Sequence, residues 1–127
     1  MNSLLENAKN TVLELEKEHG SILVFALFLR TEPLEVWDIV VSAPWLSDSD
    51  RNSYQLIASK IQNSLNEEDL LQISRIVILN KQDPAVTFLQ ETISITNGKI
   101  EEFPTEPLSD RFGFTIKQAY ILRCKKE

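Results

Sequence analysis

A chain of 127 residues with 43% hydrophobic and 25% charged residues has the size and composition of one globular domain, so we expect residues 1–127 to form a single domain. Its 13 lysines and arginines against 19 aspartates and glutamates give a net charge of −6, which disfavours binding to the phosphate backbone of nucleic acids. One cysteine, Cys124, and one histidine are too few for an internal disulfide or a zinc site. We therefore expect no cofactor, no metal site and a reducing, cytoplasmic location.

The N-terminal part of the chain predicts a helix followed by two strands. Apolar residues recur with helical spacing from Leu5 to Leu15, and Gly20 is placed to end this helix in a left-handed conformation. The runs 22–29 and 35–42 are apolar without alternation, which is typical of strands buried on both faces, and the short link between them predicts an antiparallel hairpin. Because 22–29 is also too short to cross a bilayer and no signal-peptide pattern precedes it, we expect a soluble protein of the bacterial-cytoplasm type with no membrane segment.

The middle of the chain predicts two helices and a third strand. Apolar residues over 54–65 recur with helical spacing, Asn66 is placed to cap a second, short helix, and 75–80 is another apolar strand. Since two helices separate 35–42 from 75–80, these strands can lie parallel through a right-handed crossover. We expect strands 22–29, 35–42 and 75–80 all to be internal in the sheet, or nearly so, because none of them alternates.

The segment after the third strand predicts a further helix. Asp83-Pro84 fits an N-cap followed by the first helical position, where proline loses no useful N–H. This helix extends to about Thr96, and Asn97-Gly98 is placed to stop it. The same two residues also fit the type I′ turn of a hairpin between two short strands, so both alternatives remain open.

The C-terminal segment predicts two strands separated by a loop. Residues 100–103 fit a brief edge strand, and two prolines, Pro104 and Pro107, predict a loop over 104–110. Alternating apolar residues predict a long terminal strand over 113–123. Since long unprotected edge strands pair with other chains, we expect a homodimer through strand 113–123.

These elements together predict an α/β (α+β mixed) fold, in which one mixed sheet of four to five strands carries helices on both faces, in the order α-β-β-α-α-β-α-(β)-β. In open sheets of this kind, ligands lie outside the carboxyl ends of parallel strands. No glycine-rich loop follows either parallel strand, and Ser47 or Asp48 and Asp83 are expected to cap the next helices, which disfavours nucleotide binding. The candidate binding residues at these strand ends are Ser42, Trp45, Asn80, Lys81 and Asp83.

Asp38 is a further candidate, because it is a carboxylate inside an apolar strand. Such acids mark functional sites, but Asp38 could also form an ion pair with Arg30 or Arg75, or lie on a solvated stretch of an edge. A metal-dependent nuclease would need a second acid and a lysine on the next strand, and no such motif follows, so we expect no magnesium-dependent cleavage of DNA or RNA. Trp45 is either a lid over the helix layer or an anchor for a partner or a planar ligand.

No motif assigns a chemistry to the sequence, and it identifies no catalytic residue. Two hypotheses remain. The first is a non-enzymatic interaction or regulatory module that binds protein, either a second copy or another chain. The alternative is a small enzyme or ligand-binding protein that uses a crevice near Trp45, Asp38 and Lys81.

Overall fold

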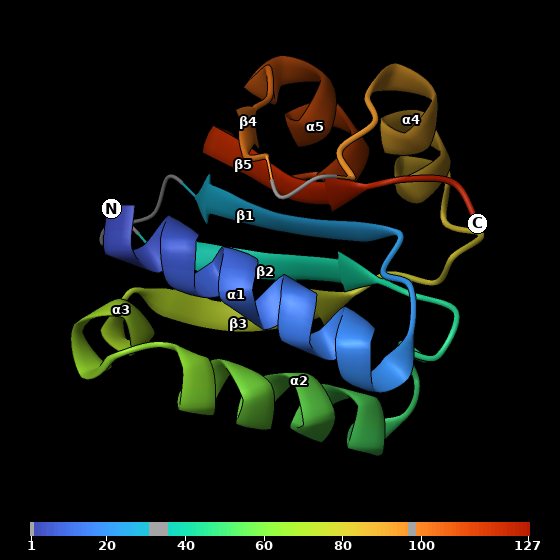
Figure 1. Cartoon of the computed structure of the whole chain (residues 1–127). Helices are drawn as coiled ribbons and strands as arrows, with labels where there is room; N and C mark the ends of the chain where they lie inside the picture. The colour runs from blue at the N-terminus through green and yellow to red at the C-terminus, as the bar shows by residue number, and fades with distance from the viewer. Residues whose placement is uncertain (1, 31–35, 97–98) are drawn as a thin grey trace.

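The structure, a computed structural model that describes residues 2–30, 36–96 and 99–127, places five helices around one five-stranded mixed sheet (Figure 1). The helices in this described part are α1 (Asn2–His19), α2 (Arg51–Ser64), α3 (Glu67–Leu71), α4 (Pro84–Thr92) and α5 (Thr105–Phe112). The strands are β1 (Val24–Arg30), β2 (Val36–Ser42), β3 (Ile73–Ile78), β4 (Glu101–Glu102) and β5 (Ile116–Cys124). The predicted α/β class with a mixed sheet is confirmed.

The strands follow the order β3-β2-β1-β5-β4, with β1 in the centre of the sheet. β1 pairs antiparallel with both β2 and β5, β4 pairs antiparallel with β5, and β2 pairs parallel with β3. The antiparallel pairing of the first two strands and the parallel crossover to the third are as predicted.

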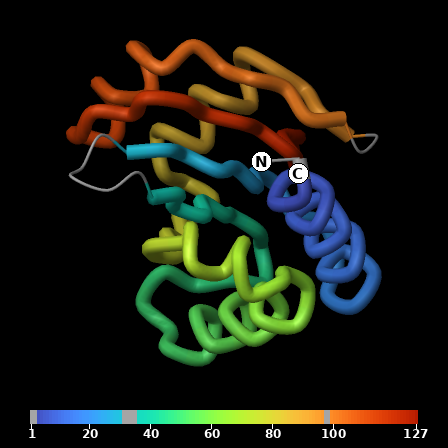
Figure 2. The backbone as a smooth tube through the Cα atoms, turned by 90° about the vertical axis from the view of Figure 1, so that its left-hand side faces the viewer, coloured from blue at the N-terminus to red at the C-terminus, as the bar shows by residue number. Residues whose placement is uncertain are grey.

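Helices cover both faces of the sheet, as predicted (Figure 1). The first face packs against α1 and α2, and the second face packs against α4 and α5. Figure 2, turned by 90°, shows α1 on one side of the strands. In β1, Phe25 and Leu27 belong to the core of the first face while Ala26 and Phe28 belong to that of the second. This explains why apolar and polar residues do not alternate in β1, since both faces of this central strand are buried.

Side-chain caps begin three of the helices. Asp83 accepts a hydrogen bond from the N–H of Ala85 and Asn66 accepts one from the N–H of Asp69, as their positions predict. The N-cap of α2 is Asp50, not Ser47 or Asp48 as expected. The reason is that 44–50 forms a loop of turns, so the cap lies two residues after Asp48 and three after Ser47.

The structure corrects the predicted positions of two strands. β3 is an edge strand, not an internal one, and β5 lies between β1 and β4, so the predicted strand 113–123 is not a free edge. Short segments cover the outer side of β5: β4 pairs with it, and Ile95 forms an isolated bridge with Cys124. The physical basis on which we expected a homodimer through 113–123 is therefore wrong.

Two further differences concern the C-terminal half. The segment 104–110, expected as a loop, lies largely within α5, because Pro107 is in the first turn, where its missing N–H has no helical acceptor in any case. α4 ends at Thr92 instead of about Thr96. The alternatives for Asn97-Gly98 fall on residues outside the described part. Among the described helices, none is both long and apolar enough to span a membrane.

Candidate functional site

The carboxyl ends of β2 and β3 form a topological switch point. The chain leaves β2 for α2 on the first face and leaves β3 for α4 on the second face, so the two connections diverge. A hollow of about 250 Å³ lies between them. Diverging connections after adjacent parallel strands create the crevice in which open α/β sheets bind ligands. The hollow is lined by Ala43, Pro44, Leu46, Ser47, Asn80, Lys81 and Gln82.

Two of the predicted site residues, Asn80 and Lys81, line this hollow. The Nζ atom of Lys81 lies 3.2 Å from a carboxylate oxygen of Glu127. Two other predicted residues at this end of the sheet are part of the fold itself: Asp83 caps α4, and Ser42 is fully buried. The structure thus brings together only a part of the set that we expected here.

Trp45 does not line the hollow but packs against the end of α1. Its ring stacks on that of His19, with ring centroids 4.9 Å apart, and its Nε1 donates a hydrogen bond to the carbonyl oxygen of Ser21 at 3.0 Å. Gly20, which follows α1 with a φ of +114°, lies next to this indole, and its backbone conformation is the reason that a glycine is favoured there. Trp45 is half-buried against the core of the first face, which favours the lid over the anchor.

Asp38 lies in the middle of β2, roughly 13 Å along the strand from its carboxyl end. Its side chain is fully buried on the second face, where Oδ2 lies 2.7 Å from Nε of Arg30 and 3.1 Å from Nε of Arg75. The structure therefore shows the ion-pair alternative, with both arginines at once. Asp38 is remote from the hollow at the end of the sheet, so it does not join Lys81 in one site.

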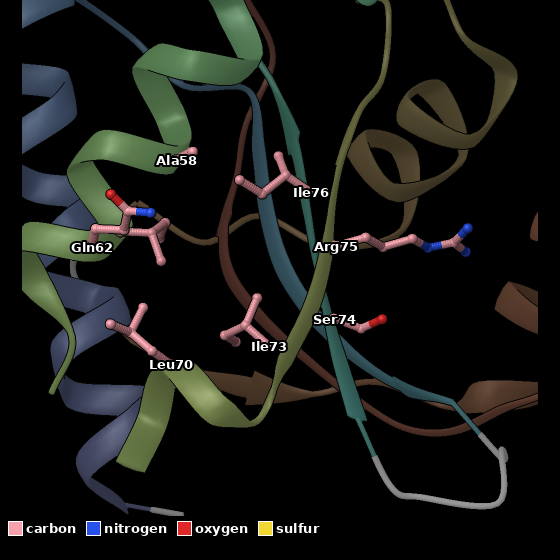
Figure 3. A pocket seen from close by; sticks show the side chains of 8 residues that line it. Ala58, Gln62, Leu70, Ile73, Ser74, Arg75 and Ile76 are labelled. Atoms are coloured by element: carbon pink, nitrogen blue, oxygen red, sulfur yellow. The ribbon is translucent and has the colours of Figure 1, made fainter. Parts of the chain in front are cut away.

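A β-bulge places two polar residues of β3 next to this ion pair. Trp37 is opposite Ile73 and Asp38 is opposite Arg75, so Ser74 is the additional residue. Nη2 of Arg30 donates a hydrogen bond to Oγ of Ser74 at 2.9 Å. The bulge turns Ser74 and Arg75 to the same side of the strand, away from α2 (Figure 3).

Arg75 is held in place but remains half-exposed. In addition to its contact with Asp38, its guanidinium carbon lies 5.1 Å from the centroid of the Phe114 ring. The side chain of Arg75 is 45% exposed, against 15% for Arg30. Nε is the atom of Arg75 that faces the carboxylate, and nearly half of the side chain as a whole is exposed.

A groove runs along the other side of β3, between this strand and α2 with α3 (Figure 3). It has a volume of about 300 Å³, and the side chains of Ile73 and Ile76 point into it, toward the helices. Leu71, which precedes β3, is 83% exposed, the highest exposure among the large hydrophobic side chains of the described residues. The groove is lined by Ala58, Ile61, Gln62, Leu70, Ile73, Ser74, Arg75 and Ile76.

The helix beside this groove is fixed to the rest of the fold. Asp69 of α3 is buried and accepts hydrogen bonds from Oγ of Ser3 at 2.8 Å and from Nδ2 of Asn7 at 3.3 Å. These contacts tie α3 to the start of α1. The walls of the groove are therefore set by the fold itself.

Sequence reasoning missed the outer edge of β3 and its residues Ser74 and Ile76. The apolar run suggested an internal strand, and nothing in its periodicity shows how many neighbouring strands it has. One signal was present, because the polar Ser74-Arg75 pair opens an otherwise apolar strand. Polar residues at such a position fit an edge that is partly in contact with water.

The nucleophilic and metal-binding side chains of the described residues do not form a catalytic set. Cys124 is fully buried, and burial raises the pKa of its thiol to about 11, so the nucleophilic thiolate is scarce at neutral pH. His19 is exposed and stacked on Trp45. No three His, Cys, Asp or Glu side chains in the described ranges are grouped so that they could hold a metal ion.

Comparisons with known proteins add no further candidate. The chain matches no protein-family model, no curated protein and no solved structure. Its function therefore has to be argued from its own geometry.

Proposed function

We propose that the protein is a non-enzymatic interaction module that receives an extended segment of a partner protein along the outer edge of β3. The observation that carries this proposal is the difference between the two edges of the sheet. At one edge, β4 consists of two exposed glutamates, Glu101 and Glu102. At the other edge, β3 is six residues long and largely apolar, and no strand in the described part of the chain pairs with its outer side.

The backbone of β3 supports pairing with an added strand. The N–H of Leu79, just after β3, donates inward to the carbonyl oxygen of Val41, so the N–H groups of Ile76 and Ile78 point to the outer edge. Proteins normally protect such an edge with charged residues, proline or a very short strand, and β4 is both short and charged. An incoming extended segment would satisfy these groups and gain affinity from main-chain hydrogen bonds.

The groove beside β3 supports recognition of side chains. In an added strand, every second side chain would point to the first face and lie over the groove between Ile76 and α2. Half-buried Ile73 and Ile76 offer apolar surface there. Burying it contributes about 25 cal/mol for each Å², so an apolar side chain in the groove adds to the main-chain contacts.

A second candidate function is the binding of a small ligand in the hollow at the switch point. Its support is the combination of the diverging connections with the exposed Lys81 and the amides of Asn80 and Gln82. Both following helices are capped by carboxylates, Asp50 and Asp83, which oppose an anion at the helix ends. This competition makes the hollow the weaker candidate.

The proposal is tested by selecting binders from a library of random twelve-residue peptides displayed on phage. Ile76→Pro removes an outward N–H and leaves the inner ladder intact, and Ile76→Lys adds a charge that guards the edge. The matched control is Leu13→Lys, which changes an apolar residue of α1 that is 46% exposed. Circular dichroism and thermal melting verify that each variant is folded.

We expect selected peptides to bind the wild type and Leu13→Lys equally, and to lose binding to both Ile76 variants. In hydrogen exchange, a bound peptide should slow exchange at the amide of Ile76. Enriched peptides that bind Ile76→Pro and Ile76→Lys as well as the wild type would overturn the proposal, as would a selection that enriches none.

A further inference from the structure

The backbone of β3 limits how a further strand can pair with its outer edge. The N–H groups of Ile76 and Ile78 point outward, because that of Leu79 bonds inward to Val41. In an antiparallel ladder, two residues that face each other exchange both hydrogen bonds, so an outward residue pairs with an outward residue of the added strand. If the added strand is β3 of a second copy, twofold symmetry leaves a small set of registers, which differ in the residue that lies on the axis.

The position of Arg75 decides among these registers. With Arg75 on the axis, two guanidinium groups would lie directly opposite each other, and like charges in that position destabilise a strand pair. The β-bulge at Ser74 also interrupts regular pairing just before Arg75. With Val77 on the axis, the two Arg75 side chains lie roughly 13 Å apart along the strands. This is also the register in which Ile76 and Ile78 pair only with each other.

The register centred on Val77 matches the two faces of the sheet. Ile76 and Ile78 pack on the core of the first face, whereas Val77 and Leu79 pack on that of the second. Ile76 then lies beside Ile78 of the second copy, and Val77 lies beside its own copy. The run Ile76-Val77-Ile78 reads the same in both directions, so each of these side chains meets another β-branched one, which favours pairing.

The charge distribution favours this edge over the rest of the surface as a contact between two copies. Two chains that each carry a net charge of −6 repel each other, so they associate best where acidic residues are few. The residues that line the groove beside β3 include no acid, and their single charged side chain, Arg75, contacts the buried Asp38. At the opposite edge, the two glutamates of β4 would face those of a second copy.

Resting on the proposed function, we infer that the segment received by β3 is β3 of a second copy of this chain, paired antiparallel about a twofold axis at Val77. The two five-stranded sheets then form one continuous sheet. Because each copy uses the same edge, the interface is isologous and the assembly closes at two chains. The dimer forms at this edge and not through the strand 113–123 that the sequence predicted.

The test uses the position of Val77 opposite its own copy. Sedimentation velocity measures the mass of the wild type, of Val77→Lys, of Val77→Glu and of an equimolar mixture of these two variants across the micromolar range of concentration. Leu13→Lys and Leu13→Glu are the matched controls, because Leu13 is an apolar residue of α1 that is 46% exposed. Circular dichroism and thermal melting verify that each variant is folded.

We expect the wild type and both Leu13 variants to form a dimer. Val77→Lys and Val77→Glu should each dimerise at least about tenfold more weakly, because like charges then face each other on the axis. Their mixture should recover the dimer, since opposite charges then face each other. Independently of these variants, hydrogen exchange at the amides of Ile76 and Ile78 in the wild type should slow as the protein concentration rises.

Four results would overturn the inference. A wild type that stays monomeric, while selected peptides bind it and lose binding to Ile76→Pro, would exclude the second copy and leave the proposed edge binding intact. A monomer that binds no peptide would remove both. A dimer that both Val77 variants retain would place the interface elsewhere. A mixture of the Val77 variants that stays monomeric would exclude the twofold axis at this residue.

Discussion

Replacing Asp38 by asparagine keeps the size of the side chain and removes its charge, so it measures what the buried ion pair contributes to stability. Arg30 is only 15% exposed and loses the carboxylate 2.7 Å from its Nε, and breaking a buried pair costs about 3–5 kcal/mol. The hydrogen bond from Arg30 to Ser74 remains, which favours the lower end of this range. Arg75 is 45% exposed and regains contact with water, so its share is below about 1 kcal/mol.

The free energy of unfolding should therefore fall by about 3 kcal/mol in Asp38→Asn, which for a chain of this length lowers the melting temperature by roughly 10–15 °C. Urea denaturation followed by tryptophan fluorescence measures the difference. Arg75→Gln is the comparison variant and should lose no more than about 1 kcal/mol. The reasoning fails if Asp38→Asn is as stable as the wild type, or if Arg75→Gln costs as much as Asp38→Asn.

Four other substitutions test the description of the core. Trp45→Ala should cost about 2 kcal/mol because the indole is half-buried, whereas Trp37→Ala, at 3% exposure, should cost about 3–5 kcal/mol; equal losses in urea melts would contradict this. Gly20→Ala should cost about 1–2 kcal/mol, because φ is +114° there, and an unchanged melting temperature would refute that strain. Burial raises the pKa of the Cys124 thiol from 9.0 to about 11 in the folded protein. The neutral thiol should therefore contribute roughly 2–3 kcal/mol to the free energy of unfolding below pH 9, and this contribution should be lost as the pH rises toward 11. The Cys124→Ala variant should not show this loss.

The sequence was sufficient for the elements that depend on local signals. The central strand is apolar on both faces because helices cover both, and the caps Asn66 and Asp83 act on the N–H groups that follow them. The neighbours of each strand depend instead on the whole chain. β3 is apolar because it packs against α2 on one face, although it has a neighbouring strand on one side only.

The candidate site was harder to predict for the same reason. Asn80 and Lys81 follow the end of β3 after Leu79, and the rule for parallel strands was enough to place them at the hollow. Arg75 became a candidate only through the bulge at Ser74, which turns both residues to one side. A register shift of this kind depends on the strand with which β3 pairs, here Asp38 and its neighbours in β2. The local periodicity of the β3 sequence therefore does not predict it.

The covered outer side of β5 determines how this sheet can grow. Head-to-tail stacking of identical molecules, with β3 of one against β4 of the next, would repeat without closing and produce a filament. β4 offers only two residues, both glutamates, and the N–H of Phe103 is already bonded to the carbonyl oxygen of Ala119 behind it. Within the described part of the chain, β4 therefore offers a poor edge for a further strand, which opposes such open-ended stacking.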